Sequence, residues 1–397
     1  MAVGQQTILV AGGAAAGQLV ALAATPWLTR AYEPGEFGPY AAFASLCAVC
    51  LTVSCLRYDV AVNAATDEEL RAVVFAALLA CLVATATIAP LAASPWGVVA
   101  IHRTVGDVAG AFRIAAAVAL CGLYQLATAT LVRDGRFAGS ALLRALQPVA
   151  FVAAALAMPW GLIDSHLVGF AVALPVLAWM LTRHRPPTLS EIGLALSRHR
   201  SFVFVSLPSA LLDALSIALP IWFIAANYSA QDTGHYAMAQ RLLAAPALIL
   251  AMAAGQVFVK RAGDLVRSGR PAQPLLRSTF GRLSTLVLAL LAAIWAFGDQ
   301  VLGLVLGDGW RIDTAFLLLA FLPAAIRSAV SPVTGIFVVR ARLHVAAMWQ
   351  FAYFAGTATL FAVLAGRVSL DTLLLAFCIS EAFYYAWYLH LADKVAN

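Results

Sequence analysis

Charged residues are scarce in this sequence: Asp, Glu, Lys and Arg make up 11% of its 397 residues, whereas 63% are hydrophobic. An ordinary globular domain carries about 25% charged and about 45–50% apolar residues. A water-soluble chain of this length could not bury so much apolar surface, which excludes a soluble globular protein. We therefore predict an all-α membrane protein, because helices of about 20 apolar residues cross a bilayer with every backbone hydrogen bond satisfied.

The signatures of common enzymes and metal sites are also missing. The sequence has no G-x-x-x-x-G-K-[ST] phosphate loop, no G-x-S-x-G elbow and no H-E-x-x-H motif. All six cysteines fall in apolar segments, and Cys47-x-x-Cys50 has no histidine or acid beside it. We expect no catalytic residue, no metal site and no cofactor, with Na⁺ or H⁺ as the candidate coupling ion.

What the sequence does contain is a series of long apolar stretches, each bounded by charges, proline or glycine. Their number predicts a polytopic protein with about twelve transmembrane helices. The stretches cover residues 7–29, 39–62, 71–93, 108–132, 141–160, 163–182, 202–226, 236–258, 280–306, 313–338, 343–365 and 370–391.

The basic residues indicate the orientation of these helices. Of the 25 Lys and Arg residues, 18 lie in the even-numbered loops and the C-terminal end, and only five lie in the odd-numbered loops. Cytoplasmic loops carry the excess of basic residues. The sequence therefore predicts that both termini lie in the cytoplasm.

A polar connection divides the chain near its midpoint. Residues 183–200 read RHRPPTLSEIGLALSRHR. Thr188 and Glu191 have capping-box spacing, and Leu189, Ile192 and Leu196 fall on one helical face, which predicts a short amphipathic helix at the cytoplasmic interface. We expect a six-helix lobe over 1–182, this linker, and a second lobe over 201–397.

An internal repeat supports two lobes. Residues 32–41 read YEPGEFGPYA and residues 228–237 read YSAQDTGHYA, so both show Tyr-x5-Gly-x-Tyr-Ala. Each copy follows an apolar stretch containing proline and opens the next stretch. Two six-helix units in parallel repeat around a central cavity are one established way to build a transporter.

Several motifs resemble one family. The first runs Pro26-Trp-Leu-Thr29-Arg30-x-Tyr32-x-Pro34-x-x-Phe37-Gly38-x-Tyr40, and the next are Leu56-Arg57-Tyr58-Asp59 and Asp67-Glu68-Glu69. Later matches are Phe204-x-x-Leu207-Pro208, Gly234-x-Tyr236, Arg241-Leu242 and Gly307-x-Gly309-Trp310. Together they resemble the polysaccharide-biosynthesis flippases, including O-antigen flippases, which belong with the multidrug and toxin extrusion exporters and the lipid II flippases. The family usually has Glu where Asp59 stands, and many relatives have two further helices.

This resemblance implies a function. A member would translocate an undecaprenyl-pyrophosphate-linked oligosaccharide, such as an O-antigen, capsule or exopolysaccharide repeat unit, across the bacterial inner (cytoplasmic) membrane by alternating access. The expected partners are that lipid-linked oligosaccharide, membrane lipid, and a polysaccharide polymerase with its chain-length protein. No nucleic acid is expected.

Polar side chains within the spans are the candidate site residues. A charge at the centre of a membrane helix costs roughly 2.5–3.5 kcal/mol on insertion scales, so each needs a reason. We expect four cations, Arg327, Arg241, Arg30 and Arg57, to line the cavity and bind pyrophosphate. The candidate coupling or polar cavity residues are Asp213, Asp59, Gln18 and Gln240. The alternative for Arg327 is a structural ion pair with Asp213 or Glu381.

Other functions remain open at this point. A drug or cation antiporter of the same superfamily would need acidic residues in the first lobe, where the spans carry little acid apart from Asp59. A membrane glycosyltransferase or polymerase would need a long outer loop, and the longest here, 94–107, offers only His102, Arg103 and Asp107. A scaffold in an export complex is a third alternative. Trp310 is a candidate for stacking on a sugar.

Overall fold

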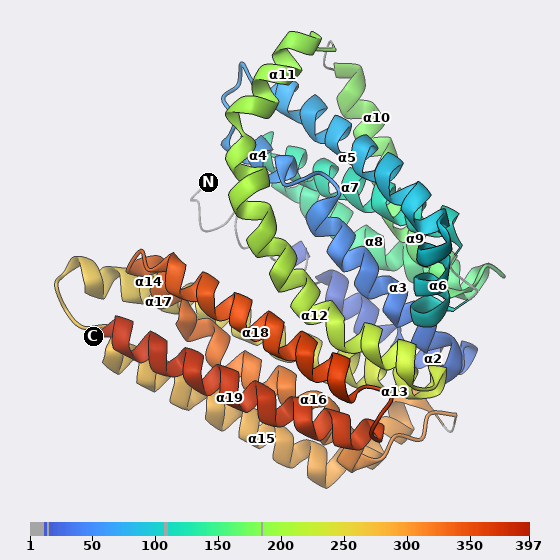
Figure 1. Cartoon of the computed structure of the whole chain (residues 1–397), viewed down its shortest axis with the longest axis vertical. Coiled ribbons are helices and arrows are strands. Elements are labelled where there is room, and N and C mark those ends of the chain that lie inside the picture. Colours follow the sequence, from blue (N-terminus) through green and yellow to red (C-terminus); the bar gives the residue numbers. More distant parts are fainter. Residues whose placement is uncertain (1–11, 14–15, 107–109, 184–185, 308) are drawn as a thin grey trace. The chain divides into compact units, whose positions relative to one another are not determined.

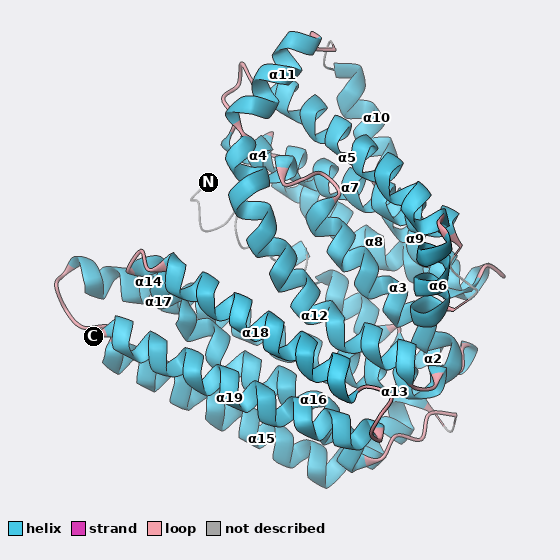
Figure 2. Cartoon of the chain, in the orientation of Figure 1, coloured by secondary structure: helices cyan, strands magenta, loops and turns pink. Residues whose placement is uncertain are grey.

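The protein is built from helices alone over the residues that can be described. The computed structural model describes residues 12–13, 16–106, 110–183, 186–307 and 309–397, and none of these forms a strand (Figures 1 and 2). The chain divides into two compact units, Met1–Ala226 and Asn227–Asn397. Each unit is described separately below.

The first unit packs around one central helix, α7 (Ala111–Arg133). Its neighbours include α3 (Pro34–Val53), α5 (Leu70–Ala93) and α9 (Gly161–Ala171). Small residues let the backbones approach closely, as membrane helices require: a Cβ on Gly122 would lie 2.5 Å from the Cys81 sulfur. The remaining helices are α2 (Thr25–Ala31), α4 (Tyr58–Ala64), α6 (Pro95–Val105), α8 (Phe137–Ala157), α10 (Leu174–Arg183), α11 (Leu189–Arg198) and α12 (Leu207–Asn227), the last preceded by a π-helical turn, η1 (Phe202–Ser206).

The second unit packs around α16 (Thr314–Val330), which contacts α13 (Ala230–Ala239), α14 (Ala245–Arg267), α15 (Gln273–Leu306) and α19 (Leu370–Ala396). The other elements are the π-helical turn η2 (Gln240–Ala244), the 3₁₀ turn η3 (Ser331–Gly335), α17 (Ile336–Val339) and α18 (Leu343–Leu364). Aromatic rings from α18 and α19 fill the space between these two helices, beginning with Trp349, which stacks on Tyr388 at 3.8 Å between ring centroids.

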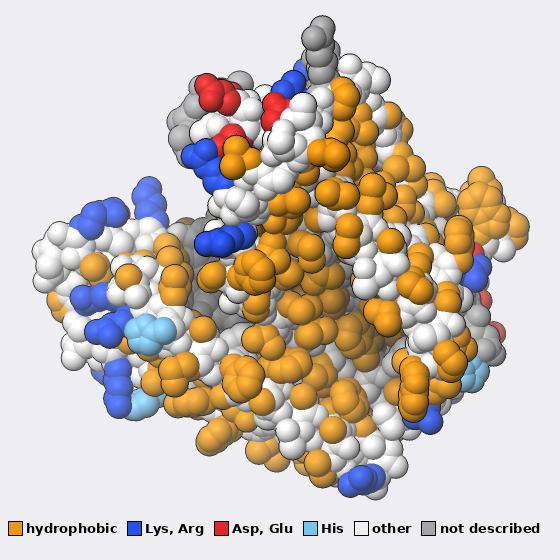
Figure 3. Space-filling model, turned by 45° about the horizontal axis from the view of Figure 1, so that its top comes forward, with side chains coloured by type: hydrophobic (Ala, Val, Ile, Leu, Met, Phe, Trp, Pro, Cys, Tyr) orange, Lys and Arg blue, Asp and Glu red, His pale blue; other side chains and the backbone are white. Residues whose placement is uncertain are grey.

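Ten helical segments among the described residues are long and apolar enough to cross a membrane. The first expected span, 7–29, lies partly outside the described residues. The eighth, 236–258, is divided into α13, η2 and α14, and α14 carries Lys260, Arg261, Asp264 and Arg267 at its end. Hydrophobic side chains cover most of the face shown in Figure 3, and large ones such as Trp96 are 87% exposed. The chain is therefore an all-α, multi-pass membrane protein.

The two repeated loops have the same local structure. Tyr32 donates its hydroxyl proton to the Ala155 carbonyl at 2.6 Å, and Tyr228 donates to the Val368 carbonyl at 2.9 Å. In each copy the next residue, Glu33 or Ser229, is the N-cap of a helix and forms a capping box with an acid three residues later. Because α12 groups with the first unit by its contacts, the division into lobes 1–182 and 201–397 stays a prediction.

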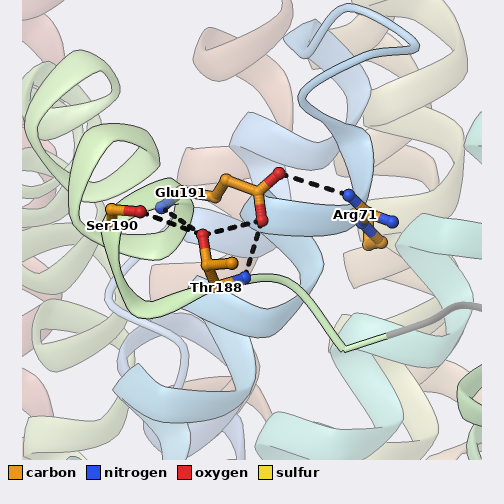
Figure 4. A network of polar contacts seen from close by, with 4 residues as sticks. All are labelled: Arg71, Thr188, Ser190 and Glu191. Carbon is orange, nitrogen blue, oxygen red and sulfur yellow. Dashed lines mark hydrogen bonds and ion pairs between the residues drawn. The ribbon is translucent and has the colours of Figure 1, made fainter.

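The predicted linker helix is α11, and its capping box is confirmed (Figure 4). The Thr188 hydroxyl accepts from the Glu191 backbone N–H at 3.3 Å, and Glu191 accepts from the Thr188 N–H at 2.6 Å. The bond from the Thr188 N–H, a second bond from the Thr188 hydroxyl to Glu191 Oε2 at 3.0 Å, and Arg71 at 3.3 Å hold the pKa of the Glu191 carboxyl below its usual range. A second ion pair joins Arg198 to Glu69.

Part of the apolar face of α11 packs against the rest of the first unit. Ile192, Ala195 and Leu196 pack against the buried cluster around α4 and α5, and Tyr58 donates to the Leu196 carbonyl at 3.1 Å. Leu189, the first residue of α11, is 86% exposed and lies outside this cluster. The placement of α11 at the membrane interface stays a prediction.

The expected outer loop over 94–107 is also different. Residues Pro95–Val105 form α6, with Ser94 as an N-cap that accepts from the Gly97 N–H at 3.1 Å. Proline at the first helical position and serine at the N-cap favour a helix start here.

Candidate functional site

Three polar side chains meet inside the second unit, each from a different helix. Arg327 lies in the last turn of α16, Tyr353 in the middle of α18 and Glu381 in the middle of α19. Arg327 Nη2 donates to the Tyr353 hydroxyl at 2.7 Å and lies 3.6 Å from Glu381 Oε1. The Tyr353 hydroxyl donates in turn to Glu381 Oε1. We call this group the Arg327 cluster.

The two charges of the Arg327 cluster are buried to different degrees. The Glu381 side chain is fully buried, whereas 23% of the Arg327 side-chain surface is accessible. Among the described residues, Glu381 Oε2 has no hydrogen-bond partner. A buried carboxylate needs a partner to offset its lost hydration, so Glu381 depends on Arg327 and Tyr353. A ligand, in contrast, can reach the pair only through Arg327.

Aromatic packing holds the Arg327 cluster in place. The Trp349 ring stacks on Tyr353 at 5.1 Å, and Trp349 Nε1 donates to the Tyr384 carbonyl at 2.9 Å. The guanidinium of Arg327 lies 5.8 Å from the Tyr353 ring centroid, within the range of a cation–π contact. Aromatic pairs of this kind stabilise the cluster beyond the apolar area that they bury.

Two polar residues, Tyr236 of α13 and Gln240 of η2, lie near the Arg327 cluster. Gln240 donates to the Ala320 carbonyl at 2.7 Å and is also a hydrogen-bond partner of Tyr236. Tyr236 is buried and within electrostatic reach of both Arg327 and Glu381. Gln240, predicted as a polar cavity residue, is thus bonded to α16 about two turns before Arg327. Arg241 is half-buried in the same π-helical turn.

The other predicted site residues all lie in the first unit. Arg57 has φ 67° and ψ 9°, a left-handed conformation that is strained for a non-glycine residue, at the break between α3 and α4. Asp59 is 2% exposed and has Gln125 as a hydrogen-bond partner. Arg30 is exposed and donates to the Pro26 carbonyl at 2.6 Å. Gln18 and Asp213 are exposed on their helices.

Tyr353 is the member of the cluster that sequence reasoning missed. A neutral aromatic residue in an apolar stretch gives no signal that separates it from ordinary packing. Glu381 did give a signal, as a charge in mid-span, and was expected only as a structural partner. The sequence left another helix, a bound anion or water as the source of a partner for Arg327, with Asp213 or Glu381 as the structural alternative; the structure pairs Arg327 with Glu381 of α19.

Comparison with solved structures identifies the architecture. The fold is similar to that of the lipid II flippase MurJ in an inward closed conformation, with a TM-score of 0.76 and 10% identity over 98% of this chain and 87% of that one. An inward-facing multidrug resistance MATE family transporter of the MOP superfamily gives 0.61 at 14% identity, over 100% and 96%. A MOP superfamily transporter from Pyrococcus furiosus Vc1 gives 0.57 at 14%, over 98% and 94%. The chain therefore has the fold of the MOP superfamily of transporters and flippases.

The sequence narrows this class further. Residues 27–313 match the family model described as "Polysaccharide biosynthesis protein". The chain belongs to this family of polysaccharide biosynthesis proteins. Comparison with curated protein sequences finds no significant match.

Proposed function

We propose that this protein is a flippase that carries an undecaprenyl-pyrophosphate-linked oligosaccharide across the bacterial inner membrane by alternating access. The cargo is an O-antigen, capsule or exopolysaccharide repeat unit. Membership of the polysaccharide biosynthesis family supports the pathway. Similarity of fold to a lipid II flippase supports a lipid-linked cargo. The observation that carries the proposal concerns Arg327. It lies in a candidate membrane span, part of its side chain is accessible, and it is paired with the buried Glu381.

Arg327 has the chemistry that a pyrophosphate requires. Its guanidinium presents a planar fork of donors, which suits phosphate oxygens better than a point charge does. Glu381 and Tyr353 hold the guanidinium while no cargo is bound, because a lone cation in a span is costly. In this proposal Arg241, Arg30 and Arg57 are further cargo-binding cations. Na⁺ or H⁺ is the coupling ion, with Asp59 and Asp213 as its candidate residues.

The experiment is flipping of a fluorescent undecaprenyl-pyrophosphate-linked sugar by the purified protein in liposomes. The double variant Arg327→Gln/Glu381→Gln removes both charges and leaves neither buried alone, so we expect a folded protein that has lost flipping. Arg327→Lys keeps the charge without the fork and should retain partial activity. Arg113→Gln/Asp164→Asn, which removes a half-exposed pair in the first unit, is the matched control. Wild-type rates in the Arg327/Glu381 double variant would overturn the assignment of Arg327.

The competing functions give other outcomes with the same liposomes. A drug antiporter would move a cationic dye down an imposed Na⁺ or H⁺ gradient and leave the lipid-linked sugar in place. A glycosyltransferase or polymerase would change the mass of the lipid-linked substrate. A scaffold would show neither activity, and the interior charges could then be replaced without effect on polysaccharide export in cells.

The proposed topology has a separate test. With both termini in the cytoplasm, the connection around Arg267 is cytoplasmic and the loop around Asp232 is external. Cysteines introduced at these two positions should differ in labelling by a membrane-impermeant maleimide added to intact cells: position 232 should react and position 267 should not. The six native cysteines are all buried, so the parent protein should give a low background. The opposite labelling pattern would reverse the topology.

A further inference from the structure

A second feature of the second unit is an open cavity of about 650 Å³ at the beginning of α16 and α19. Ligand-binding pockets are typically roughly 300–1,000 Å³, so the volume is suitable for an organic ligand. Its polar lining includes Asp232, His235, Arg311, Asp313 and Asp371, and Phe316 supplies an apolar wall. We call it the Asp313 cavity.

Most of the charged side chains that line the Asp313 cavity are available to a ligand. Asp313 is the N-cap residue of α16, yet its carboxylate makes no capping hydrogen bond. Arg311, Asp313 and Asp371 are exposed, and the structure records no ion pair among these three described residues. Asp232 differs, because it is held in the capping box with Ser229. Two carboxylates and a guanidinium are thus left facing solvent in one concave site.

The charge of the Asp313 cavity selects its ligand. Burial lowers the pKa of His235, so this imidazole is neutral at pH 7 and the three carboxylates outnumber the one guanidinium. An anionic group such as pyrophosphate is therefore disfavoured here. Among the residues that the structure describes, no three His, Cys, Asp or Glu side chains are placed to hold a metal ion. A neutral ligand with many hydroxyl groups suits the site, since carboxylates accept from hydroxyls and the guanidinium donates to their oxygens.

The Asp313 cavity and the Arg327 cluster share their helices. Phe316 and Arg327 are eleven residues apart on α16, which is three turns, so they fall on nearly the same face about 16 Å apart. On α13, His235 lines the cavity and the next residue, Tyr236, belongs to the surroundings of the cluster. The cationic Arg327 and the acidic Asp313 cavity thus lie along one helix, at a distance greater than the width of one sugar ring.

Building on the proposed function, we propose that the Asp313 cavity binds the saccharide part of the cargo, at sugars distant from the pyrophosphate. Arg327 binds the pyrophosphate. Asp313, Asp371 and Arg311 form hydrogen bonds with hydroxyl groups of sugars that lie further from the pyrophosphate. Trp310 has no part in stacking on the sugar, because it is 2% exposed and lies behind His235 at 6.1 Å between rings. The site therefore makes transport sensitive to the length of the saccharide.

The test compares two fluorescent cargoes in liposomes: undecaprenyl pyrophosphate carrying one sugar, and the same lipid carrying a complete repeat unit. Asp313→Asn/Asp371→Asn should raise the KM for the complete unit about tenfold and leave the one-sugar cargo unchanged. Asp264→Asn and Arg367→Gln, which lie outside the cavity, should alter neither cargo. Thermal unfolding of each variant in detergent checks that the fold is retained.

The outcomes separate this inference from the proposed function. If the wild-type protein flips both cargoes and the double variant does so with unchanged KM, the saccharide site is wrong and the flippase stands. Equal loss for both cargoes in a stably folded variant also contradicts a saccharide site. If the wild-type protein flips neither cargo, the proposed function itself fails.

Discussion

The two repeated loops have the same local structure, but the second tyrosine of each motif packs in different surroundings. In both units a tyrosine hydroxyl binds a distant carbonyl and the next residue starts a helix with a capping box. In the first unit, the second tyrosine of the motif, Tyr40, stacks on Phe151 at 5.4 Å. In the second unit the corresponding Tyr236 lies beside a buried ion pair. The shared hydrogen bonds stabilise the start of a helix in both units, whereas among the described residues the buried arginine–glutamate pair is found in the second unit.

The contrast extends to ion-pair energetics. Arg113 and Asp164 of the first unit form a bidentate pair, with 36% and 29% of their side chains exposed. Arg327 and Glu381 of the second are 23% and 0% exposed. Water screens the first pair, whereas the second exchanges hydration for protein contacts. The following predictions test this difference between the units.

The largest effect should come from breaking the buried pair. Arg327→Ala leaves Glu381 buried without its cation, which should destabilise the protein by about 3–5 kcal/mol. Arg113→Ala in the first unit should cost at most about 1 kcal/mol. Urea or SDS unfolding of the purified variants measures both. Adding Glu381→Gln to Arg327→Ala should recover most of the lost stability. Equal destabilisation by Arg327→Ala and Arg113→Ala would show that the two ion pairs do not differ in energy.

The next effect tests close packing in the first unit. Gly122→Ala places a Cβ 2.5 Å from the Cys81 sulfur and 2.8 Å from the Ser54 Cβ, so we expect destabilisation of about 1–3 kcal/mol through overpacking. Gly193→Ala adds a Cβ with nothing within 4 Å and should be neutral or slightly stabilising. Matching melting temperatures for these two variants would show that α5 and α7 can move apart freely.

Both tyrosine bonds should stabilise their units if the repeat is structural. Tyr32→Phe and Tyr228→Phe each remove a hydrogen bond to a backbone carbonyl, at a cost of about 1 kcal/mol, and Tyr228→Phe also removes the acceptor of the Gly366 N–H at 3.3 Å. Thermal unfolding of both single variants measures this. A loss in one unit alone would mean that the loops only look alike.

The smallest effect concerns the clamp on α11. The pKa of Glu191 is depressed in the folded protein, so its contribution is complete above its unfolded pKa and is lost as the pH falls through the lower folded value. Hydrogen exchange at the amides of residues 188–192 should therefore show less protection below about pH 4. Glu191→Gln should lack this acid-induced change. An unchanged profile in the variant would assign the opening to another group.

Much of the membrane architecture could be predicted because it depends on composition and on the regular recurrence of apolar stretches. Apolar stretches located the spans, and the Thr188 capping box and the tyrosine motif were readable as local patterns. The Arg327 cluster could be predicted only in part: the cost of a cation in a span pointed to a partner from another helix, a bound anion or water, but nothing in the sequence placed Tyr353 between Arg327 and Glu381. Contacts between helices far apart in sequence depend on packing that no local pattern encodes.

The Asp313 cavity illustrates the same difficulty. Its walls come from three separate segments, near residues 228–235, 311–319 and 369–371, each of which is an ordinary polar helix end by itself. The exposure of Leu189 and the burial of Trp310 likewise depend on neighbours that are remote in the chain.

The way α11 is held also bears on biogenesis. Its ion pairs to Arg71 and Glu69 and its bond to Tyr58 all involve residues before position 200. The N-terminal part of a chain generally folds first while translation continues at about 5–20 residues per second. Translation of the rest of the chain then takes roughly 10–40 s at these rates. The contacts that hold α11 can thus form before the residues of the Arg327 cluster have been translated. The nascent protein then completes its insertion with part of the first unit already folded.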